Sequence, residues 1–198
     1  KFTALLTYIM KDIEIVLENL VSHGIKPDQA QKIFLETFIG FDSRYRPSTI
    51  FRKQSGFGSI YLWGPVGRGK TLLLQSIANS YFQNIGIFHF LEFMQLIHLN
   101  LSKLESIKNP LPQVAKNISK NYSVIFIDEF QVEDIADAMI IGLIIQSLHH
   151  NGVRIMLSSN TAPDHLYKDG LQRDKFLKTI HFIESEFMVF HLQGEEDY

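Results

Sequence analysis

The chain has 198 residues, 45% of them hydrophobic, which suffices for one well-buried domain with an appendage but not for two full domains. A formal net charge of −2 gives no global basic field for nucleic acid, and the absence of cysteine excludes disulfides, thiolate catalysis and cysteine-ligated zinc. The longest apolar stretch, residues 138–145, is far below the roughly 20 residues that cross a bilayer, and no secretory signal is seen, so we expect a cytoplasmic protein.

Two helices are predicted ahead of the first strand. Apolar residues recur at helical spacing over residues 5–20, and His23-Gly24 breaks the pattern. A second helix is expected to begin at Asp28, which can cap it with Gln31 as the capping-box partner, and to run through Phe38.

Residues 43–58 are predicted to form a connector because proline, glycine and four basic side chains gather there. Downstream, short apolar strands alternate with helices that end near residues 82, 106, 150 and 177. The expected strands are 60–63, 86–90, 124–128, 153–159 and 187–192. This order predicts an α/β fold with a mostly parallel sheet flanked by helices. The chain would comprise a helical N-terminal extension with connector, 1–55, and a core, 56–198.

The strongest motif is a phosphate-binding loop. Residues 64–71 match G-x-x-x-x-G-K-[ST] between an expected strand and an expected helix, a context that disfavours a chance glycine-rich turn. The glycines allow backbone N–H groups to approach a triphosphate, Lys70 supplies positive charge, and the Thr71 hydroxyl can reach Mg²⁺. The predicted nucleotide-binding residues are Gly64, Pro65, Val66, Gly67, Arg68, Gly69, Lys70, Thr71 and Leu72.

A second chemical signal is the apolar strand that ends in Asp128 and Glu129. Strand ends of an open parallel sheet converge on the ligand crevice, so Asp128 is expected to hold Mg²⁺ together with Thr71. Glu129 is the candidate base, since hydrolysis needs a carboxylate that orients and deprotonates water. The alternative is an ordinary acidic helix cap ahead of residues 132–148, and the presence of the phosphate loop disfavours it.

Spacing and two further polar residues extend the predicted site. A helix, a strand and a helix fit between the phosphate loop and Asp128, an insertion typical of AAA+ and RecA-like ATPases. Asn160 ends the next strand, where its amide could contact the γ-phosphate, and is a candidate sensor. Arg173 could reach the nucleotide of a neighbouring subunit, although the charge pattern alone favours a surface arginine paired with Asp169 or Asp174.

Several blocks resemble the ZapE family of AAA+-type ATPases. They are residues 62–71, 126–130, 132–139, 159–167, 170–173 and 176–177, and the likeness runs from about Ser59 to Tyr198. The resemblance implies an ATPase that in bacteria acts in cell division through the tubulin-like protein FtsZ at the inner membrane. The AFG-like ATPases of mitochondria are relatives that assist turnover of respiratory-chain subunits.

By motif match, the resemblance assigns ATP and Mg²⁺ roles to Lys70, Thr71, Asp128 and Glu129. It gives Asn160 the sensor role and makes Arg173 the favoured arginine finger of a homo-oligomeric ring. The catalytic set implied is therefore Glu129, Lys70, Asn160 and Arg173, with Thr71 and Asp128 as metal ligands.

The chain departs from the family in two places. The family commonly reads His-Phe-His-Arg-Phe-Met where residues 89–94 read His-Phe-Leu-Glu-Phe-Met, so Leu91 and Glu92 replace a basic pair. The family also continues into a helical lid at about the point where this chain stops, so we expect a chain without the C-terminal lid.

We therefore expect an Mg²⁺-dependent ATPase of AAA+ type that regulates or remodels a protein partner. An FtsZ-like protein is the suspected partner, with peripheral inner-membrane association and no nucleic acid. A kinase or GTPase is a competing hypothesis, but residues 160–163, Asn-Thr-Ala-Pro, lack the guanine-reading Asn-Lys-x-Asp pattern. An ATP-gated binding module or helicase-loader-like factor with little turnover is a further alternative.

Overall fold

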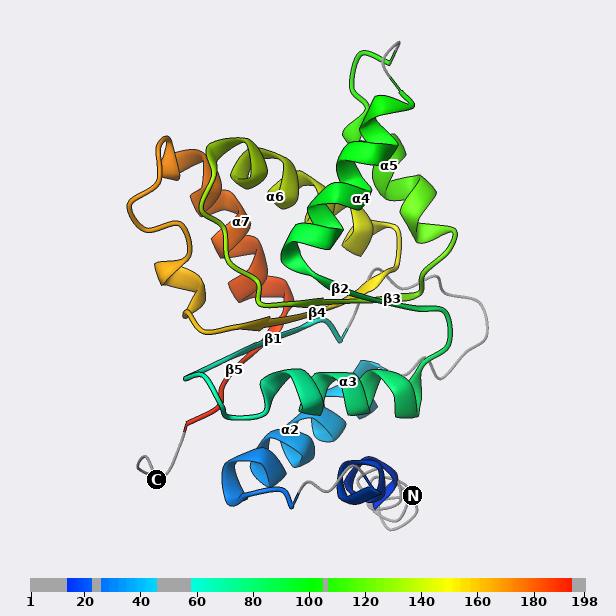
Figure 1. Ribbon diagram of the computed structural model, residues 1–198, viewed down its shortest axis with the longest axis vertical. Coiled ribbons are helices and arrows are strands. Elements are labelled where there is room, and N and C mark those ends of the chain that lie inside the picture. The colour runs from blue at the N-terminus through cyan, green and yellow to red at the C-terminus, as the bar shows by residue number, and fades with distance from the viewer. Residues whose placement is uncertain (1–13, 23–25, 46–57, 105–106, 194–198) are drawn as a thin grey trace.

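The computed structural model describes residues 14–22, 26–45, 58–104 and 107–193, and Figure 1 draws the remainder in grey. Its centre is a parallel sheet with the strand order β2-β3-β4-β1-β5. The strands are β1 Ile60–Trp63, β2 Ile85–His89, β3 Val124–Asp128, β4 Arg154–Ser159 and β5 Met188–His191. The predicted α/β parallel architecture is confirmed, with β2 as the strand inserted between the phosphate loop and β3.

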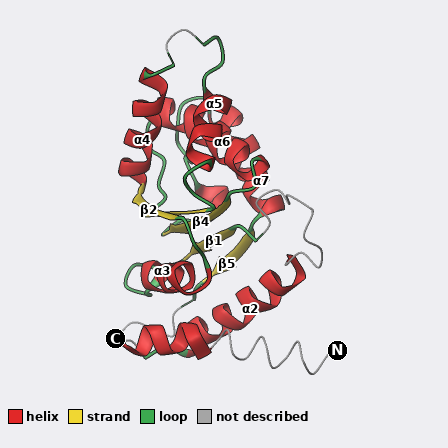
Figure 2. Cartoon of the chain, turned by 90° about the vertical axis from the view of Figure 1, so that its right-hand side faces the viewer, coloured by secondary structure: helices red, strands yellow, loops and turns green. Residues whose placement is uncertain are grey.

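Helices cover both faces of this sheet (Figures 1 and 2). The helices are α2 Gln29–Tyr45, α3 Lys70–Tyr81, α4 Phe90–Ser102, α5 Leu111–Ser119, α6 Ile135–His150 and α7 Arg173–Glu186, with a 3₁₀ turn at Pro163–His165. Helices α4 to α7 lie on one face, whereas α3 and α2 lie on the other. None of the described helices combines the length and hydrophobicity that spanning a membrane requires.

Strand β3 shows how one segment supports two hydrophobic cores. Ile125 and Ile127 pack into the cluster beneath α4 to α7, while Val124 and Phe126 pack into the cluster beneath α3 and α2. Successive side chains of a strand point to opposite faces, so both sets are buried. A strand that is buried on both faces has a continuous run of apolar residues. That run, ahead of Asp128, is the pattern from which the sequence predicted β3.

The N-terminal helices belong to the second of these cores. Residues 14–22 are helical, and Phe34, Phe38 and Ile39 of α2 are buried in the same cluster as β1 and α3. The predicted capping box of α2 is confirmed, but the predicted end at Phe38 is wrong because burial continues at Ile39 and the helix runs to Tyr45. The connector predicted for 43–58 otherwise lies mostly outside the described residues.

Two helix predictions on the other face are also wrong. Helix α5 has no counterpart among the predicted helices. Pro110 is its N-cap and Pro112 lies in its first turn, where proline is tolerated. The helix expected to end near Leu177 instead begins at Arg173 as α7, after a turn region in which Tyr167 and Gln172 have left-handed φ angles of 53° and 56°. Phe176 in the first turn of α7 is buried in the cluster beneath α4 to α7.

Helices α6 and α7 approach closely at Gly142. A Cβ built at Gly142 would lie 2.0 Å from Thr179 Oγ1 of α7, a side chain that is itself buried. We expect Gly142→Ala to lower the free energy of unfolding by about 1–3 kcal/mol through overpacking, measured by urea denaturation. Gly40→Ala on α2, where nothing lies within 4 Å, is the matched control and should be neutral or stabilising; equal effects would contradict the predicted clash.

His149 at the end of α6 is 3% exposed and packs edge-on against Phe182, with a ring-centroid separation of 5.3 Å. Its Nε2 atom finds no hydrogen-bond partner among the described residues. Burial lowers the pKa of His149, and the Glu186 carboxylate opposes this, while His150 adds to it. The folded state therefore favours the neutral ring.

The lowered pKa of His149 determines how the stability of the protein changes with pH. The unfolded chain takes up a proton near the ordinary value of 6.5, so the contribution of neutral His149 is present above that pH and is lost as the pH falls below it. We expect His149→Phe to unfold with a weaker pH dependence between pH 7.5 and 5.5 than the parent. Parallel stability curves for the two proteins would show that His149 does not titrate on unfolding.

Candidate active site

The loop between β1 and α3 has the backbone that a phosphate cradle needs. Gly67 and Gly69 adopt left-handed φ angles of 82° and 76°, which favour glycine. Gly64 has a φ of 152°, and a Cβ there would lie 2.5 Å from the Leu192 carbonyl oxygen next to β5. The glycines of the motif are therefore required by conformation and by close packing.

Lys70, the first residue of α3, is 8% exposed and lies over its own loop. Its Nζ donates hydrogen bonds to the carbonyl oxygens of Gly64 at 2.8 Å and Pro65 at 2.7 Å, and to Asn160 Oδ1 at 2.8 Å. Burial lowers the pKa of Lys70, while the nearby Asp128 carboxylate opposes that shift. The ammonium group thus links the phosphate loop to the end of β4.

A second contact joins the same loop to β3. Thr71 Oγ1 donates to Asp128 Oδ1 at 2.9 Å, and Ser158 Oγ of β4 donates to the same carboxylate oxygen. Asp128 is only 5% exposed, and its hydroxyl and carboxylate surroundings are the hard oxygen donors that Mg²⁺ prefers. Thr71 and Asp128 are therefore brought together as the sequence predicted, and the donor set fits this metal.

Ser158 was missed by sequence reasoning. It also accepts a hydrogen bond from the Glu129 backbone N–H at 3.2 Å, so one hydroxyl contacts both acidic residues. The register of β3 against β4, which pairs Ile127 with Leu157, puts Ser158 beside Asp128. A serine at the carboxyl end of a strand was a weak signal until that register was known.

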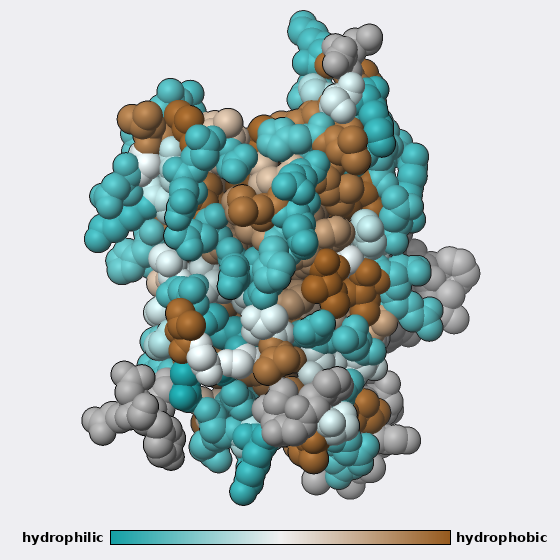
Figure 3. All heavy atoms as spheres, in the orientation of Figure 1, coloured by the Kyte–Doolittle hydropathy of each residue, from teal (hydrophilic) through white to brown (hydrophobic). Residues whose placement is uncertain are grey.

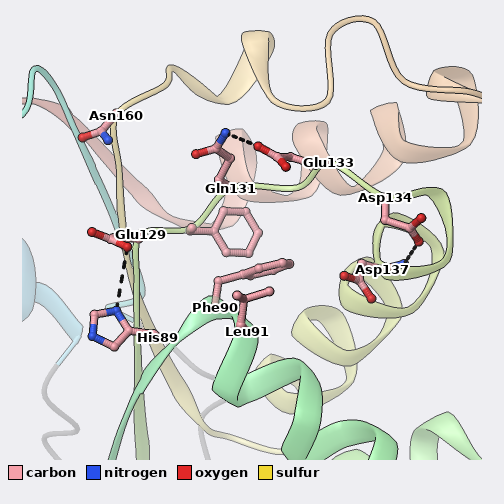
Figure 4. A pocket seen from close by; sticks show the side chains of 10 residues that line it. His89, Phe90, Leu91, Glu129, Gln131, Glu133, Asp134, Asp137 and Asn160 are labelled. Atoms are coloured by element: carbon pink, nitrogen blue, oxygen red, sulfur yellow. Dashed lines mark hydrogen bonds and ion pairs between the residues drawn. The ribbon is translucent and has the colours of Figure 1, made fainter.

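Glu129 lies beyond the end of β3, with a left-handed φ of 53° and a side chain that is 75% exposed. Its carboxylate faces His89 at the end of β2, with 4.0 Å between Glu129 Oε2 and His89 Nδ1 (Figure 4). Adjacent parallel strands bring these two residues to the same edge of the sheet. The carboxylate is accessible to water, whereas that of Asp128 is not.

Glu129 and Asn160 open onto a pocket of about 750 Å³ (Figure 4). Phe90, Leu91 and Phe130 supply its apolar wall. Glu133, Asp134 and Asp137 are the other acidic residues that line it, together with His89. Asp134 also caps α6 by accepting from the Ala136 backbone N–H at 2.6 Å. No lysine or arginine is among the described residues that line this pocket, so its mouth carries negative charge.

Leu91 and Glu92 each have a local role in the structure. Glu92 forms a capping box at the start of α4, where its carboxylate accepts the His89 backbone N–H at 2.9 Å. Leu91 is 69% exposed and lines the pocket. Figure 3 shows apolar side chains gathered on this face of the molecule over α4.

The remaining predicted residues take different places. Arg68 turns toward α2 and pairs with Asp28, with 2.8 Å between Nη2 and Oδ2, while Val66 and Leu72 are 79% and 44% exposed. Arg173 donates to the Asp164 carbonyl oxygen at 2.5 Å rather than pairing with Asp169 or Asp174. It is the first residue of α7, and no hydrogen bond or ion pair joins it to the phosphate loop among the described residues.

Comparison with solved structures extends the description of the fold. The chain superposes on DnaI with a TM-score of 0.58 and 20% identity, covering 86% of each chain. It superposes on AMPPCP-bound DnaA from Aquifex aeolicus with a TM-score of 0.58 and 18% identity, covering 85% of this chain and 48% of that one. These similarities show an AAA+-like fold and, at such identities, the fold alone.

Curated relatives are more similar in sequence but much longer. The Escherichia coli K12 cell division protein ZapE is 36% identical over 150 residues, which cover 74% of this chain and 39% of that protein. An uncharacterized Schizosaccharomyces pombe protein, C115.02c, is 34% identical over 146 residues, covering 70% of this chain and 32% of its own length. The AFG1-like ATPase family model matches residues 14–198. With nearly the whole chain matched, this protein belongs to the AFG1-like ATPase family.

Proposed function

We propose that this chain binds ATP with Mg²⁺ and hydrolyses it, and that the longer protein uses the reaction to regulate or remodel a protein partner. The observation that carries the proposal is the pair of contacts from neighbouring residues of the phosphate loop. Lys70 contacts Asn160 and Thr71 contacts Asp128, so three separate motifs meet at one edge of the sheet. Membership of an ATPase family supports the same assignment.

The phosphate loop would hold the nucleotide. In the structure, the three N–H donors of Lys70 bind two loop carbonyls and Asn160. Phosphate oxygens are stronger acceptors for an ammonium group than neutral carbonyls, so a bound nucleotide would compete for these donors. Thr71 and Asp128 would hold the metal through their oxygens. Bound Mg²⁺ would neutralise charge on the phosphates.

Glu129 would act as the general base. Its exposed carboxylate has the solvent access that orienting a water molecule requires, and the hydrogen bond from its backbone N–H to Ser158 fixes the position of the residue. Asp128, buried and bonded to Thr71 and Ser158, cannot take this role as readily. The two adjacent carboxylates therefore divide metal binding from proton removal.

Arg173 would act only between subunits. Within one chain it donates to the carbonyl oxygen of Asp164 in the 3₁₀ turn, and among the described residues no hydrogen bond joins it to the phosphate loop. A guanidinium group that completes the site of a neighbouring copy would stabilise charge in the transition state, which requires a homo-oligomeric ring.

The relative named as a cell division protein supports a role in cell division. Our proposal adds a division partner of the FtsZ type and a cytoplasmic place of action at the inner membrane. The acidic pocket beside Glu129 would repel a phosphate backbone, which supports a protein partner over nucleic acid. The chain spans 39% or less of the length of the curated relatives described above, so partner and oligomer are assigned to the longer protein.

Glu129→Gln keeps the shape of the side chain but removes the base. We expect it to bind MgATP like the parent and to lose hydrolysis by about 10²–10⁴-fold, measured as phosphate release. Lys70→Ala is the contrasting variant and should lose nucleotide binding itself. Equal turnover in the parent and Glu129→Gln would contradict the role of Glu129, and ATP-dependent partner association without phosphate release in the parent would favour an ATP-gated binding module.

An arginine finger makes hydrolysis depend on assembly. We expect the specific ATPase activity of the full-length protein to rise steeply with protein concentration, and Arg173→Ala to remove that rise while leaving nucleotide affinity unchanged. Lys175→Ala, a neighbouring exposed cation on α7, serves as the control. A specific activity that stays flat with concentration in the parent would count against a finger between subunits.

A further inference from the structure

The N-terminus of α2 is joined to the phosphate loop by two polar side chains. Asp28 and Gln31 first form a capping box, in which the Asp28 backbone N–H donates to Gln31 Oε1 at 3.0 Å and the Gln31 backbone N–H donates to Asp28 Oδ1 at 2.8 Å. These bonds use one oxygen of each side chain. They leave the NH₂ group of the Gln31 side chain and the second carboxylate oxygen of Asp28 available.

Both remaining groups contact Arg68 of the phosphate loop. Gln31 Nε2 donates to the Arg68 carbonyl oxygen at 2.9 Å, and the Arg68 guanidinium donates to Asp28 Oδ2 at 2.8 Å. Gln31 is 9% exposed, so its bond to the loop is shielded from water. Arg68 is thus held through its backbone by Gln31, 37 positions away, and through its side chain by Asp28, 40 positions away.

The contact to the Arg68 carbonyl constrains the loop backbone. In a trans peptide the C=O of one residue and the N–H of the next point in opposite directions, and the described chain has no cis peptide. A carbonyl of Arg68 fixed toward Gln31 therefore turns the Gly69 N–H away from α2. Gly69 itself, with a φ of 76°, has no side chain to hold this orientation.

The packing around Gly69 supports a specific fit. A Cβ at Gly69 would lie 3.0 Å from Gln31 Nε2, so the amide fills the space beside the glycine. The rest of α2 is anchored by Phe34 and Phe38 in the hydrophobic core. The anchored helix α2 therefore holds the Gln31 side chain against a loop whose conformation requires glycine.

We propose that Gln31, supported by Asp28, is a positioning residue for the phosphate site, which aims the Gly69 N–H at a bound nucleotide phosphate. The inference rests on the proposed nucleotide-binding function and adds the N-terminal helix to the site. Because coupling between two sites is reciprocal, a bound nucleotide also tightens the docking of α2. Any partner that displaces α2 thereby weakens nucleotide binding.

Two substitutions separate this role from helix capping. Gln31→Glu retains an oxygen for the Asp28 N–H, and glutamate is favoured at this capping position, but the side chain can no longer donate to Arg68. Gln31→Met removes the donor without adding charge. We expect both to weaken MgADP binding by about three- to tenfold, measured by titration calorimetry, with the melting temperature of Gln31→Glu within about 2 °C of the parent.

A second readout follows the coupling in the other direction. MgADP should slow hydrogen exchange at the backbone N–H of residue 31 in the parent. The slowing should be smaller in Gln31→Glu. Gln113→Glu on α5, which changes a glutamine that donates to Asn117 Oδ1 at 2.9 Å far from the loop, is the matched control and should bind MgADP like the parent.

The outcomes are distinct. Parent-like MgADP affinity in both Gln31 variants would overturn the inference while leaving the proposed function intact. Weakening in Gln31→Glu alone would also overturn it, because added negative charge would then be the cause. A parent that binds no MgADP, with Lys70→Ala indistinguishable from it, would overturn the proposed function and this inference together.

Discussion

The hydrogen bond from Thr71 Oγ1 to Asp128 Oδ1 is the contact on which the rest of the site depends. It exists because β1 and β3 run parallel and end at the same edge of the sheet, although β4 lies between them. Ser158 of β4 completes the link by donating to the same carboxylate. Three strands therefore fix one buried oxygen, and parallel sheets place their ligand crevice at that edge.

Rigidity at that edge comes from cores on both faces of the sheet. Side chains of β3 alternate between the two hydrophobic clusters, so neither face can shift without exposing apolar surface. The N-terminal helices form part of one cluster, and the capping box of α2 extends from it to the phosphate loop. The segment that the sequence suggested was an appendage thus contacts the phosphate loop.

Leu91 and Glu92 lie toward the open side of the site. Glu92 is absorbed into the capping of α4, whereas Leu91 adds an apolar surface beside the exposed Glu129. The pocket that Leu91 lines is acidic and partly aromatic, and it is also lined by Glu129, the residue to which we assign water activation.

The sequence by itself determined the α/β class, the phosphate loop and the acidic end of β3, because glycine spacing and buried apolar runs are local patterns. It did not predict the C-terminal end of α2, where burial continues at Ile39, or the start of α7, which follows the left-handed Gln172. Only the tertiary structure decided that Ser158 holds Asp128, that Gln31 holds Arg68, and that Arg173 binds the Asp164 carbonyl oxygen. These are contacts between segments far apart in the chain, and strand register and helix packing, which bring them together, leave no mark in the local sequence.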